Sequence, residues 1–141
     1  MKRSASAVWK GGLQDGRGTV SSDSGVLSNI PYNARMRFEN EKGTNPEELV
    51  AAAHAACFSM ALSLFLGQAG MTADSIETRA TVSLDAQPEG GFAVTSSHLQ
   101  TTVKIPNADR AAFEKAVEGA KVGCPISKLL KANITMDARL V

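Results

Sequence analysis

A long apolar segment constrains the fold of this chain more than any other feature of its sequence. Between Leu49 and Leu66 the run "LVAAAHAACFSMALSLFL" is apolar on nearly every helical face. Asn45 is a suitable N-cap, Pro46 suits the first helical position, and Glu48 completes a pattern that resembles a capping box. Such a helix must be enclosed on all sides, by its own sheet or by another subunit.

Short strands are expected on both sides of this helix. Residues 1–40 alternate β-like runs with turn sequences such as "DGRG", which predicts two to four antiparallel strands joined by tight turns. Residues 75–85 alternate apolar and polar side chains, as a half-buried strand does. Residues 92–105 continue this pattern, but its phase changes near Ser96–His98, which predicts a β-bulge in a long strand.

Two further helices and a final strand complete the expected order of elements. Residues 106–123 carry an apolar helical stripe, with Asn107 as the expected cap and Gly123 as the expected end. A short helix follows, with Cys124 at its cap and Pro125 at its first position, and residues 133–141 form a strand. Because strands and helices do not alternate regularly, the sequence predicts an α+β fold rather than a doubly wound sheet.

Size and composition indicate an ordinary globular protein. The chain has 141 residues, 43% of them apolar and 21% charged, so we expect a single domain over residues 1–141. A net charge of +1 without basic or acidic tracts argues against nucleic acid or a membrane surface as partners. The N-terminal residues lack the apolar core of a signal peptide, and we expect a cytoplasmic protein. In a reducing cytosol its two cysteines are thiols or form a transient disulfide.

The two cysteines occupy different local environments. Cys124 lies at a helix N-cap, where unpaired N–H groups and the helix dipole favour thiolate. Cys57 lies about three turns into the apolar helix, so burial should raise its pKa, and a reactive Cys57 would need a cation from elsewhere in the fold. On these local grounds Cys124 is the better candidate for a reactive thiol, and Cys57 reads as a small core residue.

Other polar residues near the cysteines have structural readings as well as functional ones. His54 precedes Cys57 by three positions on the same helical face, where it can act as a base, bind a metal or satisfy a hydrogen bond in the core. No further ligands follow at zinc-like spacing, so neither a metal nor another cofactor is expected. Glu47 favours the start of its helix, and Arg17 and Arg37 can be solvated charges in a turn and a strand.

Several segments together resemble one protein family. The run "GTNPEELVAAAHAACFSMALS", the later Gly-Cys-Pro and the opening "W-x-G-G-x-x-x-G-x-G" resemble the OsmC/Ohr family of osmotically induced and organic hydroperoxide resistance proteins. The resemblance covers essentially the whole chain, and "AAHAACFSMALS" and "RFE-x-EKG" are closer to the OsmC branch. It implies an α+β homodimer in which antiparallel sheets wrap around long central helices.

The resemblance also implies a function. Family members are cysteine-based peroxidases without metal or flavin, and Cys57 matches the peroxidatic and Cys124 the resolving cysteine. A dithiol such as a lipoyl group is the expected reductant by analogy with the Ohr branch. The apolar residues near Cys57, among them Phe58, Met60 and Leu64, favour organic hydroperoxides as substrates, with hydrogen peroxide a poorer one. The family name also suggests a link to osmotic stress.

A cation to activate Cys57 follows from the same resemblance. In the family, an arginine held by a glutamate activates the peroxidatic cysteine, and Glu47 matches that glutamate. The arginine stands at different positions in the two branches of the family, and this chain has an arginine at each of them. Arg37 matches the OsmC branch and Arg17 the Ohr branch, and we favour Arg37. Ten helical residues rise about 15 Å, so Glu47 and Cys57 of one chain cannot share a site, and Glu47 is expected to come from the partner subunit.

Two other functions use the same residues. A non-enzymatic thiol sensor, or a protein that binds a hydrophobic ligand, would use the same pocket without turnover. A metal-binding protein would use His54, Cys57 and Cys124 as ligands.

Overall fold

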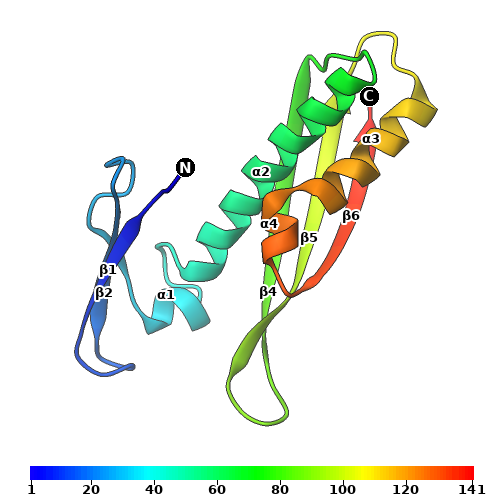
Figure 1. Cartoon of the computed structure of the whole chain (residues 1–141). Coiled ribbons are helices and arrows are strands. Elements are labelled where there is room, and N and C mark those ends of the chain that lie inside the picture. Colours follow the sequence, from blue (N-terminus) through cyan, green and yellow to red (C-terminus); the bar gives the residue numbers. More distant parts are fainter. The chain divides into compact units, whose positions relative to one another are not determined.

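The computed structural model describes all residues, 1–141, and the chain divides into two compact units. The first unit contains Met1–Leu49 and the second Val50–Val141, and each is described by itself (Figure 1).

The first unit contains a small antiparallel sheet. Its strands β1 (Ala5–Lys10), β2 (Arg17–Ser22) and β3 (Ile30–Tyr32) pair in the order β1-β2-β3, which confirms the strands predicted near the N-terminus. Gly18 is required on β2, because a Cβ atom there would lie 2.5 Å from the Tyr32 ring.

A short helix, α1 (Ala34–Phe38), follows the first sheet and was not predicted. Asn33 starts it by accepting a hydrogen bond at 2.8 Å from the backbone N–H of Met36. Arg37 therefore lies on a helix, and its interpretation as a strand residue was wrong.

The long helix α2 (Pro46–Gln68) begins as predicted. The Asn45 side chain accepts a hydrogen bond from the Glu48 backbone N–H at 2.9 Å. The Glu48 carboxylate accepts a hydrogen bond from the Thr44 hydroxyl, a contact that the capping-box pattern did not include. At the other end Gly70, with φ +74°, stops the helix.

One face of α2 is buried and the opposite face is exposed. The buried residues follow helical spacing: His54, Phe58, Leu62 and Leu66. Met60 and Leu64 are 76% and 60% exposed, so the expected enclosure on all sides is not provided by the chain itself. The helix is also long and apolar enough to cross a membrane by length and composition alone, a test that core helices of soluble proteins also pass.

The sheet of the second unit is mixed. Strands β4 (Ser75–Ala86) and β5 (Phe92–Lys104) are antiparallel, whereas β5 and β6 (Asn133–Leu140) are parallel. This parallel pair corrects the expectation of purely antiparallel sheets, and it arises because helices connect β5 to β6 as a crossover. The predicted bulge is present, with Thr95 as the extra residue beside Ser96.

The crossover consists of α3 (Arg110–Gly123) and α4 (Pro125–Leu129). Asp109 caps α3 by accepting a hydrogen bond from the backbone N–H of Ala112 at 3.0 Å, so the prediction of Asn107 as the cap was wrong. Cys124 ends α3 and caps α4, as predicted for the short helix.

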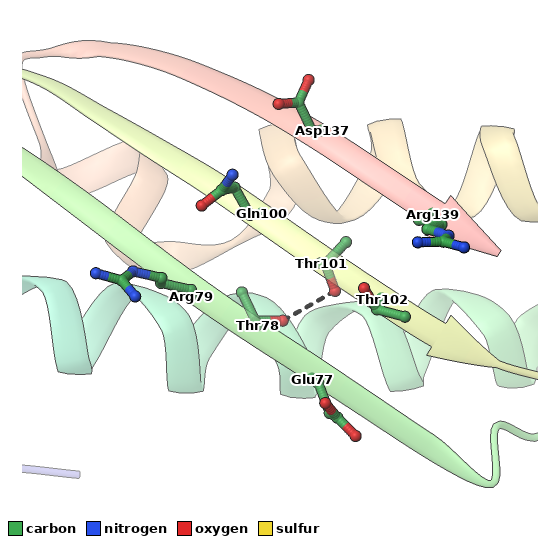
Figure 2. A pocket seen from close by; sticks show the side chains of 8 residues that line it. All are labelled: Glu77, Thr78, Arg79, Gln100, Thr101, Thr102, Asp137 and Arg139. Atoms are coloured by element: carbon green, nitrogen blue, oxygen red, sulfur yellow. Dashed lines mark hydrogen bonds between the residues drawn. The ribbon is translucent and has the colours of Figure 1, made fainter. Parts of the chain in front are cut away.

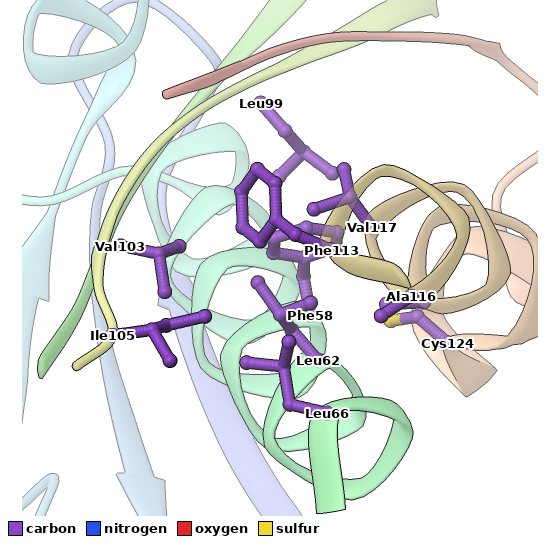
Figure 3. Close-up of a cluster of buried hydrophobic side chains, with 11 residues drawn as sticks. Phe58, Leu62, Leu66, Leu99, Val103, Ile105, Phe113, Ala116, Val117 and Cys124 are labelled. Atoms are coloured by element: carbon purple, nitrogen blue, oxygen red, sulfur yellow. The ribbon is translucent and has the colours of Figure 1, made fainter. Parts of the chain in front are cut away.

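Helices α2, α3 and α4 lie on one face of the second sheet (Figure 1), and the core fills the space between them (Figure 3). This core consists of Phe58, Leu62, Leu66, Leu99, Val103, Ile105, Phe113, Ala116, Val117, Ala120 and Cys124.

Candidate active site

The fold brings the two cysteines of the second unit into contact. Cys57 lies on α2 and Cys124 at the junction of α3 and α4, and their Sγ atoms are 2.9 Å apart although 67 positions separate them in sequence. Both are free thiols; Cys124 is fully buried beside the core (Figure 3), and Cys57 is partly exposed. Since a disulfide bond is about 2.0 Å long, a small movement would join the two sulfur atoms.

The surroundings of Cys57 favour the neutral thiol. Burial raises the pKa of the Cys57 thiol, and the adjacent Cys124 raises it further, whereas a backbone hydrogen bond from Ile126 lowers it. All of these groups belong to the second unit, and none is a cation. A thiolate at Cys57 therefore needs a positive charge that this unit does not supply.

His54 is fully buried one turn before Cys57. Its Nδ1 lies 2.7 Å from Ser97 Oγ on β5, and its Nε2 lies 2.8 Å from Ser127 Oγ on α4. Burial lowers the pKa of His54, which keeps the imidazole neutral near pH 7. Of the readings open for His54, the structure thus shows a core histidine with both ring nitrogens in hydrogen bonds.

The first unit holds a cation that is hydrogen-bonded to a carboxylate. Arg37 on α1 donates two hydrogen bonds to the Glu47 carboxylate, from Nε at 3.1 Å and from a terminal nitrogen at 2.7 Å. The hydrogen bond to Glu47 raises the pKa of Arg37 against the opposing effect of burial, so the guanidinium stays charged. Its central carbon also lies 5.3 Å from the centre of the Phe38 ring.

Arg17 has a different position in the first unit. It is exposed at the start of β2 and lines a hollow together with Asp15, Arg35 and Glu41. It makes no ion pair, and the carboxylate of Glu47 is bound to Arg37. Of the two arginines considered, the structure therefore pairs Arg37 with Glu47.

Arg37 borders an apolar cavity of the first unit. The cavity has a volume of about 190 Å³, and its other lining residues include Trp9, Leu13, Tyr32 and Phe38. A cavity of this kind can accept a small apolar group next to a guanidinium.

Outside the cysteine pair, the structure has a polar hollow but no cluster of metal ligands. No group of three or more His, Cys, Asp or Glu side chains lies close enough to hold a metal ion, and thus His54, Cys57 and Cys124 do not form one. The open face of the second sheet has a shallow polar hollow (Figure 2), lined among others by Arg79, Arg139 and the hydrogen-bonded Thr78 and Thr101.

Sequence reasoning missed two serines that contact His54. Ser97 and Ser127 are distant from it in sequence, by 43 and 73 positions, and neither has a local signal for this role.

The fold and this site define a class: a small α+β protein whose long helix places one thiol against a second thiol from a crossover. The chain belongs to the OsmC family, because the model of that family, described as OsmC-like protein, matches residues 39–139. It is 55% identical over 134 residues to Peroxiredoxin OsmC of Escherichia coli (strain K12), covering 95% of this chain and 93% of that protein. It is also 32% identical to the organic hydroperoxide resistance protein OhrB of Bacillus subtilis (strain 168), covering 87% of this chain and 88% of that protein.

Solved structures agree with this assignment. The crystal structure of OhrB of Bacillus subtilis superimposes with a TM-score of 0.68 at 31% identity, covering 98% of each chain. An OsmC-like protein from Mycoplasma pneumoniae gives a TM-score of 0.77 at 22% identity, covering 100% of this chain and 98% of that one, which supports the fold alone. The predicted α+β, OsmC-like fold is confirmed.

Proposed function

We propose that this protein is a thiol peroxidase that reduces organic hydroperoxides. The thiolate of Cys57 attacks the outer oxygen of the O–O bond, and the protonated leaving oxygen departs as an alcohol, which leaves a sulfenic acid on Cys57. The Cys124 thiol then condenses with the sulfenic acid, which forms a disulfide and releases water. A dithiol reduces the disulfide and restores both thiols.

The contact between the two sulfur atoms carries this proposal. At 2.9 Å, Cys124 is close enough to react with an oxidised Cys57 without a large rearrangement of the fold. The contact is also buried on the Cys124 side, which limits the access of other thiols to the disulfide. The names of the relatives, peroxiredoxin and organic hydroperoxide resistance protein, support the same chemistry.

Activation of Cys57 is assigned to Arg37. Within its own unit the pKa of Cys57 is raised, so the reaction needs a nearby cation to favour the thiolate. The two hydrogen bonds that Arg37 donates to Glu47 fix its guanidinium and leave part of the side chain exposed, at 37% of its surface. Glu47 precedes Cys57 by ten residues of α2, about 15 Å of helix, and we therefore assign the Arg37–Glu47 pair to the Cys57 of a partner subunit.

The proposed preference for organic peroxides rests on the apolar surface beside Arg37 and beside Cys57. Arg37 borders the apolar cavity with Trp9, Leu13 and Phe38, and Met60 is exposed one turn beyond Cys57 on α2. Burial of an alkyl or aryl group there would add binding free energy, roughly 25 cal/mol per Å² of apolar surface. Hydrogen peroxide has no such group, and we expect it to be a poorer substrate.

The remaining assignments follow from this function. The exposed apolar face of α2, with Met60 and Leu64, fits a homodimer in which the two long helices cover each other. Residues 1–141 would then act as one OsmC-like domain in the cytoplasm. A small dithiol, such as a lipoyl group, is the proposed reductant.

Turnover in the presence of a dithiol tests the proposal. Wild-type protein should consume many equivalents of cumene hydroperoxide when dithiothreitol is present, and Cys57→Ser should consume none. Cys124→Ser should retain the first step, so a dimedone-type probe should trap a sulfenic acid on Cys57.

The contrary results are distinct. Consumption by Cys57→Ser at the wild-type rate would exclude the mechanism. Consumption of a single equivalent by wild-type protein, whatever the dithiol concentration, would indicate a sensor rather than an enzyme.

A further inference from the structure

The hydrogen bonds of His54 form a second connection between the two segments that carry the cysteines. His54 lies three positions before Cys57 on α2, and its partner Ser127 lies three positions after Cys124 on α4. Side chains three apart share a helical face, so the His54–Ser127 and Cys57–Cys124 contacts are neighbouring links between the same two segments. One link is sulfur to sulfur at 2.9 Å, and the other is Nε2 to Oγ at 2.8 Å.

The segment that holds Cys124 is attached to the core at Cys124, which is fully buried, and through Ile126 of α4, which packs against the core. None of the five residues of α4 is fully buried, and Cys124 makes no side-chain capping hydrogen bond at its start. His54 is fully buried, and its other ring nitrogen is held by the fully buried Ser97 of β5. Through Ser127, His54 therefore adds a side-chain hydrogen bond between this short helix and the core.

A neutral imidazole suits this connection. A neutral ring donates from one nitrogen and accepts at the other, which matches one hydroxyl partner on each side. The two buried side chains of the network, His54 and Ser97, are fully satisfied by these bonds. The connection does not depend on the state of Cys57, because neither hydrogen bond involves a sulfur atom.

If the protein has the proposed peroxidase function, the His54–Ser127 link has a role in disulfide formation. When Cys57 becomes a sulfenic acid, its thiol contact with Cys124 is replaced. Two reactions then compete for the sulfenic acid. Condensation with the Cys124 thiol gives the disulfide and water, whereas a second hydroperoxide transfers one oxygen to give the sulfinic acid and an alcohol. Displacement of Cys124 slows the first reaction only.

We propose that His54 is a positioning residue for the resolving step: through Ser127 it holds Cys124 against the oxidised Cys57 and thereby limits overoxidation to the sulfinic acid.

Removal of one hydroxyl tests this role. Ser127→Ala deletes the link, and Ser127→Thr, which keeps a hydroxyl, is the conservative rescue. Ser59→Ala is the matched control, because Ser59 lies on α2, as His54 does, and its hydroxyl donates a 2.9 Å hydrogen bond to Thr78 of β4 rather than linking α2 to α4. Mass spectrometry after cumene hydroperoxide treatment gives the fraction of sulfinic acid and of disulfide in each variant.

We expect Ser127→Ala to reach half-maximal overoxidation at a roughly fivefold lower hydroperoxide concentration, the effect of one lost hydrogen bond. The rate of sulfenic acid formation in Ser127→Ala should stay at the wild-type value. Ser127→Thr and Ser59→Ala should both reach half-maximal overoxidation at the wild-type hydroperoxide concentration. Wild-type behaviour of Ser127→Ala, or an equal shift in Ser59→Ala, would overturn the proposal.

A second measurement keeps this test separate from the proposed function. In equilibrium with reduced and oxidised dithiothreitol, the Cys57–Cys124 disulfide forms without any peroxide. Ser127→Ala should lower its equilibrium constant by up to roughly fivefold, because Cys124 of the reduced variant loses its fixed position whereas the disulfide still holds it. An unchanged constant would overturn the positioning role even if the protein proved not to be a peroxidase, whereas a lowered constant without peroxide turnover would refute only the proposed function.

Discussion

At the scale of single residues, the site is defined by a thiol whose own surroundings oppose its ionisation. Burial and Cys124 raise the pKa of Cys57, and only a backbone hydrogen bond from Ile126 acts in the other direction. In the proposed mechanism Arg37 supplies the opposing positive charge, because two hydrogen bonds that it donates to Glu47 fix its guanidinium. Substitution of Arg37 tests this proposal.

Arg37→Gln should raise the pKa of Cys57, because the variant loses the positive charge that favours the thiolate, and should therefore lower the rate of thiolate alkylation at pH 7. The pH dependence of iodoacetamide alkylation, measured in a Cys124→Ser background, reports this pKa directly. Arg17→Gln is the matched control, since Arg17 makes no ion pair, and its profile should be unchanged. An equal shift in both variants, or none in Arg37→Gln, would remove Arg37 from its assigned role.

At the scale of secondary structure, most elements follow from local patterns, and the errors have local causes. The start of α2 was predicted because Asn45 and Pro46 are strong start signals. Helix α1 was missed because five residues are too few for a helical period to be visible. The parallel pairing of β6 was missed because strand direction depends on the path of the chain rather than on its own side chains.

The start of α3 offers a test at this scale. Asp109 makes the capping hydrogen bond, whereas Asn107 has a positive φ of 52° and lies outside the helix. Asp109→Ala should lower the free energy of unfolding by about 1 kcal/mol. Asn107→Gly should change it by less than about 0.5 kcal/mol, because glycine accepts this backbone conformation without strain. Urea denaturation of both variants measures these free energies. A larger loss of unfolding free energy in Asn107→Gly than in Asp109→Ala would contradict Asp109 as the cap of α3.

At the scale of the whole molecule, the contact between the cysteines was not available from local sequence patterns. Local reasoning ranked Cys57 as structural, and only the resemblance to a family implied that it meets Cys124. The reason is physical: the contact closes a loop of 67 positions, and it depends on the packing of α2, α3 and α4 on one sheet. The apolar sequence of α2 likewise extends beyond the core of the chain, since Met60 and Leu64 are exposed.

The most direct test of this account is the product formed when fully reduced protein receives one equivalent of cumene hydroperoxide per subunit. Intact-protein mass spectrometry should show the loss of two hydrogen atoms, and peptide mapping should find Cys57 joined to Cys124 within one chain. A product in which Cys57 carries added oxygen while Cys124 remains a free thiol, or in which the cysteines join different chains, would contradict the central claim that these two thiols form one peroxide-reducing pair.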